Sequence, residues 1–276
     1  LKRLQDEVTP TPFDQVKRVV EEDLGQPLSA VFAEFDPVPL ASASIGQVHK
    51  ARLLANHATV VVKVQHPNVD EKILQDITNM GNILDWIEFL EPNIELKPVL
   101  EDWSRELHKE LDFRLESQNM SDVGALLASD AAVYAALPAL IPGMCSKRVL
   151  VMRFINGAKI SDLDALRRVG VDSPEAKADL AVAVCDAFGR SLFVDGIFNA
   201  DPHAGNLLVA VPSQLEPGAV MFSPAAAQQQ LLQRGSGAGS TALTTTTTTT
   251  RTGAGAGASA GANANAVERP LPVLLD

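Results

Sequence analysis

Apolar positions recur at helical spacing in three stretches of the chain, residues 13–24, 70–90 and 174–195. Side chains that return every three or four residues lie along one face of an α-helix, so each stretch predicts an amphipathic helix. Pro174 fits the first turn of the last helix. The expected apolar faces are Phe13, Val16, Val19, Val20 and Leu24; Ile73, Ile77, Met80, Ile83, Leu84 and Ile87; and Leu180, Val184, Ala187, Phe188, Leu192 and Phe193.

Other segments carry different patterns. A longer helix is expected over residues 98–127, and strands are expected within residues 38–66. Residues 147–156 predict two short strands, because apolar β-prone residues dominate them. Residues 271–276 form a short apolar segment that predicts a strand ending in Asp276.

The texture changes completely over residues 212–268. This segment holds a Gln triplet at residues 228–230, a Thr run at 244–250 and a Gly/Ala alternation at 253–262. It lacks large apolar residues at a useful period, so it cannot bury enough surface to offset chain entropy. We therefore predict a disordered insert between two strands, which a fold tolerates because loop-closure entropy grows only logarithmically with length.

Composition narrows the classes of protein. The chain has 276 residues, a net charge of −11 and a pI near 4.9, which argues against nucleic-acid binding as the main role. Cys145 and Cys185 are too few for a disulfide framework and predict two reduced, partly buried thiols. No uninterrupted apolar run has the length of a membrane span.

Asp201 and Asn206 lie five positions apart in a loop expected behind an apolar segment. This is the spacing of a protein-kinase catalytic loop, in which the Asp faces the attacking hydroxyl and the Asn holds a metal ion. The pair alone is a weak signal, because chance produces it often. His203 lies between them, and the pattern favours an imidazole that holds the loop backbone over a metal ligand.

Two further features lie upstream, in the order that a phosphoryl-transfer site needs. Residues 39–51 combine small residues with Gly46 and an alternating strand, and small side chains let backbone N–H groups approach phosphates. Lys63 stands inside the β-prone run of residues 60–65, a costly place for a charge unless it is paired. An edge-strand lysine directed to solvent is the alternative interpretation.

Together these segments resemble the UbiB-like (ADCK-type) atypical kinase family, most of all its plant and algal members. The resemblance covers residues 1–211 and resumes at residues 269–276. The similar phrases are Leu40-Ala-Ser-Ala-Ser-Ile-Gly-Gln-Val-His-Lys-Ala51, Val61-Val-Lys-Val-Gln-His-Pro67, Glu110-Leu-Asp-Phe-Arg-Leu-Glu116 and Phe198-Asn-Ala-Asp-Pro-His-Ala-Gly-Asn206.

The chain also departs from the family pattern. Ala204 stands where the family usually has a second Pro in its Asp-Pro-His-Pro-Gly-Asn loop. The family's Lys-x-Gly-Gln extension would precede Leu1, and the Gly after the metal-binding Asp would follow Asp276. We therefore expect the chain to be a fragment or a truncated reading of a longer protein.

The resemblance implies an α+β, protein-kinase-like bilobal fold. An N-terminal helical segment at residues 1–27 would precede a small lobe with family-specific helices at residues 28–155. The large lobe would start at residues 156–211 with the catalytic loop, and residues 269–276 would supply the strand ending in the metal-binding Asp. Because the rest of the large lobe would follow that strand, we expect it to be truncated and the apolar face of residues 174–195 to lack its usual cover.

The resemblance also assigns the strand lysine and the nucleotide-binding surface. Lys63 would bind the α/β-phosphates and pair with Glu116 or Glu110, which cannot point the same way if they lie six residues apart on one helix. Glu110 and Asp112 would belong to the family's Glu-x-Asp feature, and a solvated acidic helix face is the alternative. The expected nucleotide-binding residues are Ala41, Ser42, Ala43, Ser44, Ile45, Gly46, Val48, Lys63, Met152, Arg153 and Phe154.

The remaining roles fall in the second lobe. Asp201 would be the catalytic base or orient the acceptor, and a turn-forming Asp before Pro202 is the alternative. Asn206 and Asp276 would hold Mg²⁺, which prefers hard oxygen ligands. An Asp at the end of a strand without a metal is almost as good an interpretation of Asp276.

By resemblance, the expected function is ATP or ADP binding with Mg²⁺ and ATPase or kinase-like phosphoryl transfer. The family links the chain to isoprenoid-quinone and lipid metabolism, with a lipid, quinone precursor or membrane surface as partner, in a mitochondrion or chloroplast. A non-catalytic, nucleotide-binding regulatory or lipid-associated module is the second hypothesis. An acidic scaffold without nucleotide is the third, and the paired occurrence of Lys63 and Asp201 argues against it.

Overall fold

The computed structural model describes residues 9–91, 93, 95–128, 135–197, 203–211, 220–222 and 271–274. The helices are α1 (Phe13–Leu24), α2 (Leu28–Val31), α3 (Val69–Leu90), α4 (Lys97–Glu110), α5 (Phe113–Ala128), α6 (Leu163–Arg168) and α7 (Pro174–Arg190). The strands are β1 (Phe32–Phe35), β2 (Ala41–Ser42), β3 (Gly46–Leu53), β4 (Thr59–Gln65), β5 (Ala135–Leu137), β6 (Leu140–Cys145), β7 (Val149–Arg153), β8 (Ala158–Lys159), β9 (Leu207–Ala210), β10 (Val220–Phe222) and β11 (Leu271–Leu274).

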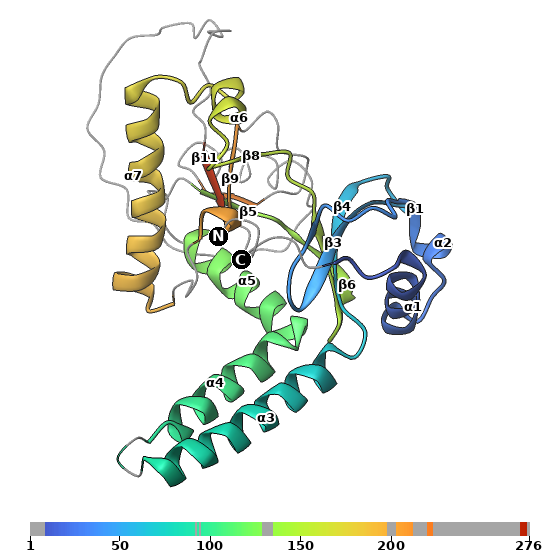
Figure 1. Ribbon diagram of the computed structural model, residues 1–276. Coiled ribbons are helices and arrows are strands. Elements are labelled where there is room, and N and C mark those ends of the chain that lie inside the picture. Colours follow the sequence, from blue (N-terminus) through green and yellow to red (C-terminus); the bar gives the residue numbers. More distant parts are fainter. Residues whose placement is uncertain are drawn as a thin grey trace, which may run out of the picture.

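These strands form two separate sheets, and the chain passes between them from β5 to β6 and again from β7 to β8. The first sheet has the order β1-β3-β4-β7-β6, with β2 paired to β3. The second has the order β10-β5-β11-β9-β8. Helix α1 covers one face of the first sheet, while α7 and α6 pack against the second (Figure 1). Helices and largely antiparallel sheets are thus segregated, as the α+β prediction requires.

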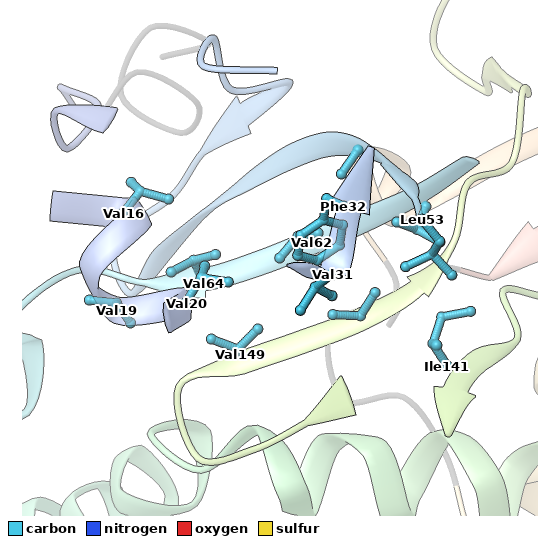
Figure 2. Packing of buried hydrophobic residues seen from close by; sticks show 13 residues of the cluster. Val16, Val19, Val20, Val31, Phe32, Leu53, Val62, Val64, Ile141 and Val149 are labelled. Atoms are coloured by element: carbon cyan, nitrogen blue, oxygen red, sulfur yellow. The ribbon is translucent and has the colours of Figure 1, made fainter. Parts of the chain in front are cut away.

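The main core lies between α1 and the first sheet. Helix α1 begins after Pro12, whose fixed backbone angle suits a helix start, and ends at Gly25, which has a positive φ of 66°. Its valines at 16, 19 and 20 pack on alternate residues of β4 and β7, as Figure 2 shows for Val64 and Val149. The amphipathic pattern of residues 13–24 is confirmed with both boundaries.

The predicted helix over residues 98–127 is in fact two helices, α4 and α5. They are separated at Leu111 and Asp112. Leu111 is 4% exposed and Phe113 is 2% exposed, and Phe113 packs against Leu150 and Met152 of the first sheet. Residues two apart lie on nearly opposite sides of a helix, so one continuous helix could not bury both. The break satisfies both side chains.

Helix α3 confirms the prediction for residues 70–90, but its expected apolar face is only partly protected. Together with α4 it forms a hairpin that projects away from both sheets (Figure 1). Ile83 is 59% exposed and Met80 is 39% exposed. Trp86 and Phe89, which were not assigned to the face, are 71% and 80% exposed. Helical spacing predicted the helix but not the depth of its burial.

Three expectations about the second half of the chain need correction. Residues 147–156 contain one strand, β7, instead of two. Strand β10 lies inside the segment predicted to be disordered and pairs antiparallel with β5. Helix α7 ends at Arg190, where a π-helical turn follows, and Leu192 and Phe193 are 45% and 84% exposed instead of buried.

No helix among the described residues is long and apolar enough to cross a membrane.

Candidate functional site

Lys63 and Glu116 form an ion pair between strand β4 and helix α5. Lys63 Nζ donates to Glu116 Oε1 at 2.7 Å and to Oε2 at 2.8 Å. The two side chains are 24% and 23% exposed, so both are largely withdrawn from water. Nζ also lies 4.9 Å from the ring centre of Phe113, a cation–π contact. The pairing offsets part of the cost of placing a lysine within an apolar strand.

Strand alternation explains why Lys63 lies opposite the main core. Val62 and Val64 pack toward α1, so Val61 and Lys63 face the other way. On that side, an apolar cluster surrounds the ion pair: Phe113, Met120, Leu150 and Met152, with Ile45, Val61, Leu140 and Cys145 packed against it. We call the surface formed by Lys63, Glu116 and this cluster the Lys63 face.

The loop at residues 41–46, which we call the small-residue loop, is connected to the Lys63 face by strands β2 and β3. Ala41 pairs with Val48, and Val48 in turn pairs with Lys63. Gly46 is required at the start of β3, because a Cβ there would lie 2.5 Å from the Val64 carbonyl oxygen. The glycine therefore serves close backbone approach between β3 and β4.

Residues 152–154, which were expected to contact an adenine, differ in how they contribute to the Lys63 face. Met152 is 7% exposed and lies in the cluster of the Lys63 face. The backbone N–H of Arg153 donates to the Ala139 carbonyl, and that of Phe154 donates to the Thr59 carbonyl. The Phe154 ring lies 4.4 Å from Lys50 Nζ. Both N–H groups are therefore occupied, and the side chain of Met152 is the part of this segment that lies in the cluster of the Lys63 face.

The structure separates Glu110 from Glu116. Glu110 is exposed at the last position of α4, while Glu116 stands in the first turn of α5 and meets Lys63. Asp112 lies between the helices and accepts from the Arg114 backbone N–H at 3.0 Å. Hydrogen bonds from Arg114 hold the pKa of Asp112 below its ordinary value. Asp112 thus stabilises the start of α5, which carries Glu116.

The candidate catalytic loop is described only from His203 onward. His203 Nδ1 accepts from the Gly205 N–H at 3.0 Å, which agrees with the predicted loop-holding role. Asn206 ends a 3₁₀ turn directly before β9. Asp201 and Asp276 lie outside the described residues, so their assignments stay predictions.

Strand pairing brings the two ends of the long insert together. Strand β11 pairs antiparallel with β9, and Leu274 lies opposite Leu207, the neighbour of Asn206. The predicted strand after the insert therefore exists and pairs with the strand of the candidate loop. Most of the insert itself, residues 212–219 and 223–268, lies outside the described residues.

Contacts that fix α1 to the turn between β6 and β7 were not found from the sequence. Asp23 of α1 accepts hydrogen bonds from Ser146 Oγ and the Arg148 backbone N–H, at 2.6 and 3.0 Å. Burial alone would raise the pKa of Asp23, but these bonds and the Arg148 side chain hold it below its ordinary value. No spacing rule links residues 125 positions apart, so no signal in the sequence indicated this contact.

The thiols and acidic groups of the described residues form no metal-binding cluster. Among the described residues, no cluster of three or more His, Cys, Asp or Glu side chains could hold an ion. Both cysteines are free thiols; Cys145 is half-buried and Cys185 is exposed, which corrects the expectation that both are partly buried. Burial raises the pKa of Cys145, which keeps its thiol protonated and unreactive.

Comparison with known proteins extends this picture. The ABC1 atypical kinase-like domain matches residues 3–222. Probable protein kinase UbiB of Marinobacter nauticus is 37% identical over 79% of this chain and 39% of its own length. AarF domain-containing protein kinase 1 of Xenopus tropicalis is 34% identical over 80% and 41%, respectively. The chloroplastic protein Activity of bc1 complex kinase 1 of Arabidopsis thaliana is 32% identical over 74% and 30%.

A solved structure supports the fold. The complex of Rv3197 with erythromycin, from Mycobacterium tuberculosis, has a TM-score of 0.58 and 26% identity, covering 79% of this chain and 54% of that one. The chain spans 41% or less of the three relatives' own lengths. The fold is protein-kinase-like and α+β, as predicted. Since the domain match covers most of the sequence, the chain belongs to the ABC1 atypical kinase-like family.

Proposed function

We propose that this chain binds ATP or ADP with Mg²⁺ on the Lys63 face and acts as an ATPase or phosphoryl-transfer enzyme. The Lys63–Glu116 pair carries the proposal, because both carboxylate oxygens lie within 2.8 Å of Nζ. A carboxylate that grips the ammonium group fixes its position while leaving 24% of the lysine side chain exposed to a ligand. Kinase-like sites use such a strand lysine to hold nucleotide phosphates.

The rest of the nucleotide would fit the elements around this pair. Backbone N–H groups of the loop at residues 41–46 would lie over the phosphates, since its small side chains permit close approach. Val48, Val61 and Met152 offer the apolar surface that a purine base needs. Specificity for ATP or ADP over other nucleotides stays a prediction from the resemblance.

Residues of the second lobe would complete the chemistry. Asn206 and Asp276 would supply an amide and a carboxylate oxygen to Mg²⁺, which neutralises charge on the phosphates when bound. Asp201 would orient a water or hydroxyl group and take its proton while that oxygen bonds to the γ-phosphorus and ADP leaves. The pairing of β9 with β11 supports the part of this arrangement that involves Asn206.

A second candidate function is a nucleotide-binding module without turnover. Ala41, Ala43 and Ser44 occupy loop positions where ordinary kinases use glycine. Residues with a Cβ restrict the loop backbone, which would favour tight binding over the movements that turnover requires. Ala43→Gly tests this restriction, because it should change nucleotide selectivity or raise phosphorylation if the loop restrains a kinase.

The acceptor and the location of the protein are proposed by family resemblance. The resemblance links the chain to isoprenoid-quinone metabolism, with a quinone precursor or lipid as partner. The chloroplastic relative supports an organelle, and by family resemblance a chloroplast or mitochondrion is proposed.

The paired measurement of binding and hydrolysis tests the proposal. Asp201→Asn keeps the size of the side chain but removes its charge, so turnover should fall by about two or more orders of magnitude, as expected for lost general acid–base catalysis. Mg-ATP affinity should be retained, because Asp201 acts on the acceptor side. If wild type and variant both bind ATP and show the same negligible hydrolysis, the module without turnover is the better account.

A further inference from the structure

Thr11, in the segment before α1, is hydrogen-bonded at three atoms to the first sheet. Its backbone N–H donates to Gln47 Oε1 at 2.7 Å, and its carbonyl accepts from Gln47 Nε2 at 3.2 Å. Its hydroxyl lies 2.7 Å from His66 Nδ1. These contacts join positions 36 and 55 residues apart, so the segment is fixed by the sheet and not by its neighbours in sequence.

The anchor of this contact is rigid. Gln47 is 1% exposed and its neighbour His49 is 0% exposed. Because a backbone N–H can only donate, the Thr11 bond fixes the Gln47 amide with Oε1 as acceptor and Nε2 as donor. Nε2 then also donates to His49 Nε2 at 2.8 Å, and His49 Nδ1 donates to the Asp36 carbonyl at 2.8 Å. A fully satisfied buried network of this kind holds one geometry.

His66 transmits the contact to the small-residue loop. Its backbone N–H donates to the Ile45 carbonyl at 2.9 Å, and its ring Nε2 donates to the Ala43 carbonyl at 2.9 Å. With the proton on Nε2, Nδ1 accepts the hydroxyl proton of Thr11. Thr11 thus orients the ring that holds the loop.

The bond to Ala43 matters because of peptide geometry. In a trans peptide the carbonyl and the next N–H point in opposite directions, so fixing the Ala43 carbonyl also fixes the direction of the Ser44 N–H. The loop's own side chains do not replace this bond. Among the described residues, the buried Ser42 Oγ has no hydrogen-bond partner.

We propose that Thr11 is a positioning residue, which acts through His66 to hold the loop at residues 41–46 in the conformation that receives a nucleotide phosphate. The inference rests on the proposed nucleotide function. It adds that the segment before α1 sets the affinity of the site. Any change that pulls Thr11 away from His66 then weakens nucleotide binding without altering the sheet.

Thr11→Val tests this role, because it removes the hydroxyl and keeps the shape and both backbone bonds to Gln47. Two readouts are needed in the intact protein: hydrogen exchange of the peptide covering residues 41–46 without nucleotide, and the affinity for Mg-ATP. We expect exchange to accelerate and the Kd to rise by about 2- to 10-fold each, the scale of one hydrogen bond. Thr11→Ser keeps the hydroxyl and should show the exchange rate and the Kd of the wild type. Thr9→Val, at an exposed position of the same segment, should change neither.

The outcomes separate this inference from the proposed function. Unchanged exchange and affinity in Thr11→Val overturn the inference. Faster exchange with unchanged affinity also overturns it, since the loop would then bind nucleotide without the tether. If wild type binds no Mg-ATP but Thr11→Val still accelerates loop exchange, the proposed function fails while the ordering role of Thr11 stands.

Discussion

The two faces of strand β4 differ sharply although their residues alternate along one strand. Val60, Val62 and Val64 are fully buried against α1 and its neighbours. Val61 and Lys63 are half-buried on the opposite side, where Lys63 meets Glu116. A period of two lets a single strand supply the main core on one face and a charged group on the other. The strand that carries Lys63 is therefore also part of the main hydrophobic core.

The largest expected effect concerns the charged face. Glu116→Ala should lower turnover by about 100-fold, because Lys63 loses the group that positions it and small misplacements are costly in catalysis. Glu110→Ala is the matched control: the same residue type, exposed at the end of α4, should leave turnover within about 2-fold. Steady-state ATP hydrolysis measures both. Equal losses in the two variants would remove the distinction between the glutamates.

The next largest effect concerns the face of β4 that packs toward α1. Val62→Ala should lower the free energy of unfolding by about 2 kcal/mol, through lost apolar burial and a residual cavity. Val61→Ala removes the same atoms from a half-buried site and should cost less stability, while weakening nucleotide binding. Urea unfolding and Mg-ATP titration of both variants would show whether stability and binding divide between the faces. A larger stability loss for Val61→Ala would contradict this division.

The smallest effect is the pH dependence of stability. Burial lowers the pKa of His49, although a hydrogen bond to the Asp36 carbonyl opposes the shift. His49 therefore becomes protonated near pH 6.5 in the unfolded chain, while in the folded chain it stays neutral at that pH. Stability should be level above about pH 7 and fall as the pH drops through 6.5, by at most about 1.4 kcal/mol per pH unit.

Histidine variants isolate this slope. In urea unfolding between pH 7.5 and 5.5, His49→Gln should lose the slope whatever its absolute stability. His57→Asn should keep it, because His57 is exposed and Asn tolerates its positive φ of 54°. The same slope in all three proteins would show that His49 does not cause it. Asp23, whose pKa is lowered, adds stability that is fully present above about pH 3.8 and is lost as the pH falls below that value through the folded-state pKa.

Sequence reasoning reached the elements whose signal is local. The spacing of residues 13–24 predicted α1, and the place of Lys63 in an apolar strand predicted a paired lysine. The choice between Glu110 and Glu116 could not be made, because the assumed single helix hid the break that Leu111 and Phe113 impose. That break depends on tertiary burial, which a helical period does not encode.

Contacts between distant segments could not be predicted from the sequence, because they too depend on tertiary packing. Thr11 and His66 each look like ordinary loop residues in sequence, and their hydrogen bond exists only because α1 packs against β4 and β7. Strand β10 was missed because its three residues are surrounded by low-complexity sequence and gain stability only by pairing with β5. Exposure of the α3–α4 hairpin likewise depends on what surrounds it, not on its period.

Mg-ATP-induced thermal stabilisation tests the central claim most directly, namely that the Lys63 face holds a nucleotide. Wild type should gain about 2.7 kcal/mol of stability at a nucleotide concentration 100 times the Kd. Lys63→Ala should lose this gain while the unliganded protein still unfolds cooperatively. Lys17→Ala, which changes an exposed lysine of α1 on the other side of the sheet, should keep it. An undiminished gain in Lys63→Ala would contradict the assignment of this face.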